Sequence, residues 1–175
     1  MQNFTTMKEG QKVSALICMT DITGFMRISR SEDMETVFAI LKDIAVISTK
    51  KIEGTPGKII KYIGDASLIM FPEEFVDSGV CKLLELKEDL EGYFKQKGYS
   101  NKVTFCLHFG EVILGRLPPV DSIDVFGDTV NIAFILDREG HSGRFIISSQ
   151  VFRKLKPETR KRFHKFTHPV VYLAE

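Results

Sequence analysis

Two acidic residues each lie where an apolar segment meets a turn, and this position suits cation binding. Asp21 ends the stretch KVSALICMTD, and Asp65 lies at the tip of a Gly64–Asp65 turn between two apolar segments. Two carboxylates that meet repel each other unless a proton or a cation separates them. Mg²⁺ takes one or two carboxylates and completes its shell with waters and phosphate oxygens. Simple turn capping explains either acid alone equally well, because aspartate is common in turns.

The turn that follows Asp21 adds a second chemical feature. Residues 22–25 read ITGF and lead towards a helix, so their backbone N–H groups would face a bound triphosphate. The pair of acids and this turn together predict a site for a metal–nucleotide complex.

The apolar periodicity predicts the elements that must position these residues. Their order is β-α-β-β-α-β, which is the ferredoxin-like split βαβ plan of an α+β protein, with extra C-terminal strands. In that plan the first strand lies between its partners, so Asp21 and Asp65 meet near one edge of the sheet. We expect Ser31 to cap the first helix and Gly54 to end it. The expected strands cover 12–21, 58–63, 66–71, 103–108, 111–117, 144–147 and a hairpin within 163–173; the expected helices cover 31–53, 72–97, 128–138 and a short segment after 148 or 149.

Length and composition restrict the class of protein. The chain has 175 residues, 24 Lys plus Arg against 23 Asp plus Glu, and three cysteines in apolar segments. This predicts one domain over 1–175, and it argues against a strongly basic nucleic-acid binder. The sequence contains neither an apolar run of about 18 residues nor a secretory leader, so we expect a cytoplasmic protein with reduced thiols that does not engage a membrane.

Four motifs occur in an order that resembles a known family. They are DITGF from Asp21, KYIGD ending at Asp65, HFGEV from His108 and DVFGDTVNIA from Asp124. Together they resemble the catalytic domain of class III adenylate and guanylate cyclases, over about residues 13–172. The fold expected from this resemblance is the same α+β plan.

The resemblance implies roles for individual residues. Asp21 and Asp65 match the family's two metal acids, which hold two Mg²⁺ or Mn²⁺ ions while the ribose 3′-oxygen attacks the α-phosphate. Asp124 matches the acceptor for the adenine amino group, and Asn131 matches the residue that orients the ribose. Family sites lie between two chains, one giving the metal acids and the other the base and ribose contacts. The residues that match the phosphate-binding turn are Ile22, Thr23, Gly24 and Phe25.

Two positions depart from the family pattern. The transition-state arginine, four residues after Asn131, is replaced by Ile135, and the adenine-contacting lysine is expected at Ile59, beside Lys58. Arg138, two turns after Asn131, is a possible substitute for the arginine, and a surface ion pair is the alternative for it. Each lost donor to the transition state costs about 10²–10³ in rate, so a slow enzyme is expected.

The sequence therefore predicts a nucleotide cyclase that converts ATP, rather than GTP, into cyclic AMP and pyrophosphate as a homodimer. The alternative is a non-catalytic nucleotide-binding or regulatory homologue that forms a heterodimer with another cyclase chain. A nucleic-acid binder using the basic strip Arg153–Lys165 is a weaker third hypothesis, because only Phe163 interrupts that strip with an aromatic ring.

Overall fold

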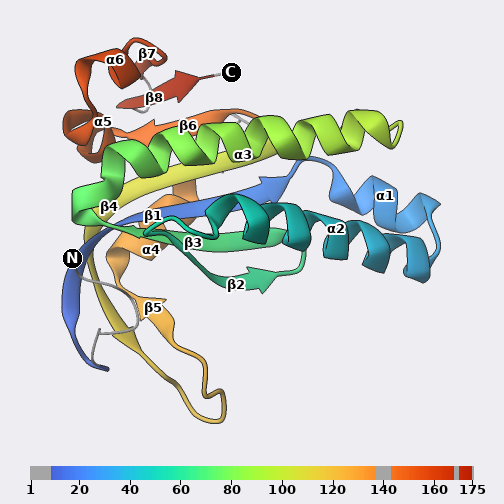
Figure 1. Cartoon of the computed structure of the whole chain (residues 1–175), viewed down its shortest axis with the longest axis horizontal. Coiled ribbons are helices and arrows are strands. Elements are labelled where there is room, and N and C mark those ends of the chain that lie inside the picture. Colours follow the sequence, from blue (N-terminus) through green and yellow to red (C-terminus); the bar gives the residue numbers. More distant parts are fainter. Residues whose placement is uncertain (1–8, 137–142, 168–169, 175) are drawn as a thin grey trace.

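The computed structural model describes residues 9–136, 143–167 and 170–174, which form an eight-stranded sheet with helices on both faces (Figure 1). The strand order is β2-β3-β1-β4-β6-β8-β7, and β5 pairs with β4 outside this path. The predicted α+β architecture is confirmed. No helix of these ranges is long and apolar enough to cross a bilayer.

The strands are β1 (Lys12–Ile22), β2 (Lys58–Ile63), β3 (Ala66–Pro72), β4 (Val103–Gly115), β5 (Asp124–Phe126), β6 (Phe145–Ser148), β7 (His164–Thr167) and β8 (Val170–Ala174). The helices are α1 (Phe25–Ser31), α2 (Met34–Ile52), the 3₁₀ turn η2 (Glu73–Phe75), α3 (Val76–Gln96), α4 (Asp128–Ile135), α5 (Ser149–Lys154) and α6 (Pro157–Arg160).

Strand β1 is buried on both faces, as its continuous apolar sequence predicts. Leu16 and Cys18 point into the larger core cluster, whereas Ile17 and Met19 point into the second cluster on the opposite face. β1 pairs antiparallel with β3 on one side and with β4 on the other. The end of β1, where Asp21 lies, is therefore fixed by two neighbouring strands.

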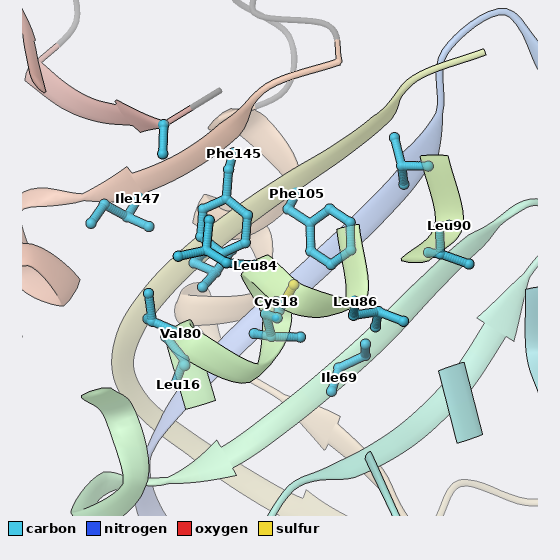
Figure 2. Close-up of a cluster of buried hydrophobic side chains, with 14 of the residues drawn as sticks. Leu16, Cys18, Ile69, Val80, Leu84, Leu86, Leu90, Phe105, Phe145 and Ile147 are labelled. Atoms are coloured by element: carbon cyan, nitrogen blue, oxygen red, sulfur yellow. The ribbon is translucent and has the colours of Figure 1, made fainter. Parts of the chain in front are cut away.

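The larger core lies between the sheet and the pair of helices α2 and α3. Figure 2 shows side chains from α3, β1, β3, β4 and β6 meeting there. Phe105 of β4 and Phe145 of β6 stack with their ring centroids 5.5 Å apart, and both are fully buried. This packing makes the sheet a rigid base for the residues at its edges.

The opposite face of the sheet is covered by α4. Thr129 donates a hydrogen bond from its hydroxyl to the Glu111 carbonyl at 2.6 Å, which anchors the first turn of α4 to β4. A β-carbon on Gly110 would lie 2.6 Å from the Thr129 hydroxyl oxygen, so only glycine permits this approach. Asn131 on α4 is thereby held at a fixed place over the sheet.

The structure differs from three sequence-based expectations. A separate helix, α1, follows the turn after Asp21, and Ser31 lies at its end rather than at the start of α2. Asp33 caps α2 instead, because its carboxylate accepts a hydrogen bond from the Thr36 N–H at 2.7 Å. Strand β4 continues across Gly110 where two strands were expected, since its pairing with β1 runs unbroken from 103 to 113.

Candidate active site

The structure brings Asp65 beside the residue that follows Asp21. Asp65 lies in the two-residue turn between β2 and β3, where Ile63 pairs with Ala66. The backbone N–H groups of Asp65 itself and of Ile22 face its carboxylate and favour the charged form. Burial raises the pKa of this carboxyl, although the two N–H groups oppose that shift. A partly desolvated carboxylate gains from a bound cation.

A hydroxyl pair fixes the strands next to the two acids, since Thr20 directly precedes Asp21 and Ser67 follows Asp65 by two residues. Thr20 of β1 and Ser67 of β3 lie opposite each other, with their side-chain oxygens 2.6 Å apart. The Ser67 N–H also donates to the Thr20 hydroxyl oxygen at 3.1 Å. Because both residues are buried, this contact sets the distance between the end of β1 and the tip of the β2–β3 hairpin.

Asp21 lies on the same face of β1 as Ile17 and Met19, towards α4. It lines a small cavity of about 60 Å³ together with Thr104 and Phe134. No cluster of three or more His, Cys, Asp or Glu side chains suited to a metal ion occurs in the described ranges. The two predicted metal acids, Asp21 and Asp65, are carboxylates, and two carboxylates suit Mg²⁺ or Mn²⁺ when phosphate oxygens supply further ligands.

The turn over residues 22–25 has fewer available donors than the sequence suggested. The Ile22 N–H faces the Asp65 carboxylate, and the Thr23 N–H donates to the Lys102 carbonyl at 2.9 Å. The N–H groups of Gly24 and Phe25 remain at the start of α1, where first-turn N–H groups have no acceptor within the helix. Gly24 has φ +72°, and a β-carbon there would also lie 2.8 Å from Nη2 of Arg27. The positive φ therefore requires glycine, whereas the Arg27 side chain could move aside.

Asp124 lies in a second group of polar residues, where β2 passes β5. Its Oδ2 lies 2.5 Å from Nζ of Lys61, and its Oδ1 accepts from the Val125 N–H at 2.8 Å. A lysine therefore lies next to Asp124, at Lys61 rather than at Ile59, the position that the family pattern led us to expect. The reason is a register shift in β2 between Ile59 and Lys61, which changes the facing of the residues that follow it.

The helix α4 carries the remaining predicted residues. Asn131 is exposed, and Ile135, one turn later on the same side, is 49% exposed. At the position where the family has an arginine, this protein therefore exposes an apolar side chain to solvent. Arg138 lies outside the described residues.

Sequence reasoning missed two residues that contact predicted site residues. Lys61 was overlooked because strand alternation was assumed to be regular. Asn101, which donates to the Thr23 carbonyl at 2.8 Å, lies in a loop far from every motif, and nothing in the sequence marks it.

Comparison with known proteins agrees with this arrangement. The family described as adenylate and guanylate cyclase catalytic domain matches residues 6–171. An adenylate cyclase of Anabaena cylindrica is 25% identical over 162 residues, covering 85% of this chain and 32% of the relative. A germination-specific adenylate cyclase of Dictyostelium discoideum is 29% identical over 151 residues, covering 80% of this chain and 17% of the relative. The chain thus spans about a third or less of the length of these relatives.

Solved structures show the same fold. The adenylyl cyclase CyaB from P. aeruginosa superposes with a TM-score of 0.78 at 17% identity, covering 94% of this chain and 95% of the other. The guanylate cyclase domain of RhGC from Catenaria anguillulae, solved in complex with GTP, gives a TM-score of 0.72 at 19% identity, covering 93% and 95%. Both adenylate and guanylate cyclases are therefore among the structural neighbours.

Proposed function

Since the chain belongs to the family of adenylate and guanylate cyclase catalytic domains, we propose that it converts ATP into cyclic AMP and pyrophosphate. The observation that carries this proposal is the position of the Asp65 carboxylate beside the backbone of Ile22, the residue directly after Asp21. Two carboxylates so placed match the metal-binding half of such a site.

Asp21 and Asp65 would hold two Mg²⁺ or Mn²⁺ ions, which would activate the ribose 3′-hydroxyl and neutralise the polyphosphate. The protein's own contribution is to keep both acids in position through the Thr20–Ser67 contact. The N–H groups of Gly24 and Phe25 would donate to the phosphates. The 3′-hydroxyl would lose its proton to solvent, and its oxygen would form a bond to the α-phosphorus while the bond from that phosphorus to the pyrophosphate oxygen breaks.

The Lys61–Asp124 pair supports ATP rather than GTP as the substrate. Adenine presents an amino donor at N6 beside an acceptor at N1. A carboxylate and an ammonium side by side match that order, with Asp124 accepting and Lys61 donating. Guanine presents the reverse order, an acceptor at O6 beside a donor at N1, which would place O6 against the carboxylate. The Val125 N–H fixes the orientation of the Asp124 carboxylate, so this match needs little rearrangement.

Turnover by this site is expected to be slow and to require a dimer. Ile135 cannot donate to the developing charge, and arginines in that role contribute about 10³–10⁵ in phosphoryl transfer. In the proposed homodimer, Asp21 and Asp65 of one chain face Lys61, Asp124 and Asn131 of its partner.

The direct test is to incubate the purified chain with Mn²⁺ and either ATP or GTP, and to separate the products by chromatography. We expect cyclic AMP in excess of cyclic GMP, and no product from Asp21→Asn. Sedimentation with nucleotide present should show a dimer. Lack of cyclic nucleotide from a dimeric, nucleotide-bound wild type would refute the catalytic function.

The exposed Ile135 favours a second candidate function, a nucleotide-binding homologue that pairs with another cyclase chain. Such a protein would contribute Asp21 and Asp65 to a mixed site while the other chain contributes the arginine. This function predicts activity only when a second, arginine-bearing cyclase domain is added.

A further inference from the structure

The turn after Asp21 is held by a loop segment that precedes β4. Three groups of Thr23 are engaged by residues 101–104. Its N–H donates to the Lys102 carbonyl at 2.9 Å, its carbonyl accepts from Nδ2 of Asn101 at 2.8 Å, and its hydroxyl lies 3.4 Å from that of Thr104. The backbone between Asp21 and Gly24 is therefore held at Thr23 through both its N–H and its carbonyl.

Thr104 is itself held in place. It lies opposite Asp21 in the β1–β4 pairing, and its hydroxyl accepts from the Gly143 N–H at 2.8 Å. Thr104 also lines the small cavity next to Asp21. The Thr23 hydroxyl therefore contacts Thr104, a residue that lines the same cavity as Asp21.

Helix α3 fixes the loop segment through Glu91. The Glu91 carboxylate accepts from the Val103 N–H at 3.2 Å and from Nζ of Lys102 at 3.0 Å, and it forms an ion pair with Lys87. The side chains of Lys87 and Glu91 are only 6% and 18% exposed. Burial alone would raise the pKa of Glu91, but the hydrogen bonds from Lys87, Lys102 and Val103 outweigh it and lower this pKa. Glu91 therefore stays ionised and keeps the start of β4 in place.

We propose that Asn101 is a positioning residue of the active site and that Glu91 anchors the segment that carries it. The proposal rests on the proposed function, because the turn that Asn101 orders is the one that would contact the metal–nucleotide complex. Asn101 touches no reacting atom. It acts through the Thr23 carbonyl, which belongs to the same peptide group as the Gly24 N–H and lies one peptide before the N–H of Phe25.

The chemistry of the contact explains why an amide is needed. Replacing Asn101 with Ala removes the donor and leaves the Thr23 carbonyl to water. Replacing it with Asp keeps the shape but places a carboxylate against a carbonyl, which repels it. Net contributions of one hydrogen bond correspond to about a 3- to 10-fold change in an equilibrium.

The experiment measures binding and turnover separately. Affinity is measured by calorimetry with Mn²⁺ and 3′-deoxy-ATP, which lacks the attacking hydroxyl and so cannot be cyclised. We expect Asn101→Ala to weaken this affinity about 3- to 10-fold and to lower kcat with ATP, and Asn101→Asp to do so at least as strongly. Ser100→Ala, an exposed neighbour in the same loop, is the matched control and should leave both unchanged.

A residue with only a structural role would lower the melting temperature without changing the affinity of the folded protein. The proposal is overturned if Asn101→Ala and Asn101→Asp bind and turn over like Ser100→Ala. If the wild type binds 3′-deoxy-ATP but forms no cyclic product, the proposed function fails, while a weaker affinity of Asn101→Ala still supports the positioning role. If the wild type is active and both Asn101 variants match it, only the positioning role fails.

Discussion

Restoring an arginine at position 135 should raise the rate of cyclic AMP formation about 10²-fold. Asn131 and Ile135 lie one turn apart on α4, so a guanidinium at 135 would face the same side as the ribose contact. A gain of 10² corresponds to about 2.7 kcal/mol of transition-state stabilisation, at about 1.36 kcal/mol per tenfold. This is the lower end for a single donor to developing charge.

The substitution should not unfold the protein. Ile135 is 49% exposed, so the side chain buries about half of its apolar surface. Full burial of isoleucine contributes about 1.5–3 kcal/mol, which limits the loss here to about 1–1.5 kcal/mol. That is a small part of an ordinary stability of about 5–15 kcal/mol. The catalytic gain is therefore larger than the structural cost.

The assay is the initial rate of cyclic AMP formation with Mn²⁺ and ATP, with sedimentation as a check that the dimer persists. Ile135→Lys carries the charge without the planar donor fork, so its rate of cyclic AMP formation should rise less than that of Ile135→Arg. Ile135→Met is the neutral control, and its rate should equal that of the wild type. An unchanged rate in a dimeric Ile135→Arg protein would refute this reasoning, and loss of activity in Arg138→Ala would show that Arg138 supplies the donor instead.

Three further predictions concern metal, base and pH. Asp21→Asn should abolish calorimetric binding of Mn²⁺ with 3′-deoxy-ATP, because one carboxylate holds a hard cation weakly; unchanged affinity would contradict the metal assignment. Lys61→Met should raise KM for ATP about 10-fold and reduce the preference for ATP over GTP, whereas Lys58→Met on the same strand should not. Burial lowers the pKa of His108, and the nearby Asp128 only partly offsets this, so the unfolded state takes up the proton first as the pH falls. The free energy of unfolding should therefore fall as the pH drops through about 6.5, by at most about 1.4 kcal/mol per pH unit. The dependence should flatten in His108→Gln but not in His164→Gln, and a wild-type stability that is constant from pH 7 to 5.5 would contradict this.

The fold could be predicted well because its main signals are local. The apolar run before Asp21 is buried on both faces, and the Gly64–Asp65 turn joins two paired strands, as expected. Helix α1 was missed because seven residues give too little periodicity to detect. Ser31 and Asp33 both resemble caps in sequence. Only the path of the chain between α1 and α2 decides that Asp33 accepts the Thr36 N–H.

The site was predicted less completely because its contacts depend on backbone detail that residue spacing does not report. Counting back along a regular strand leads to Ile59, but the register shift in β2 brings Lys61 to Asp124 instead. Counting N–H groups in the turn gives four donors, but the Thr23 N–H already donates to the Lys102 carbonyl and the Ile22 N–H faces Asp65. Motifs thus indicate which residue types meet a substrate. The bulges and loop contacts that select among those residues arise from pairing between distant segments, so they become visible only once the chain is folded.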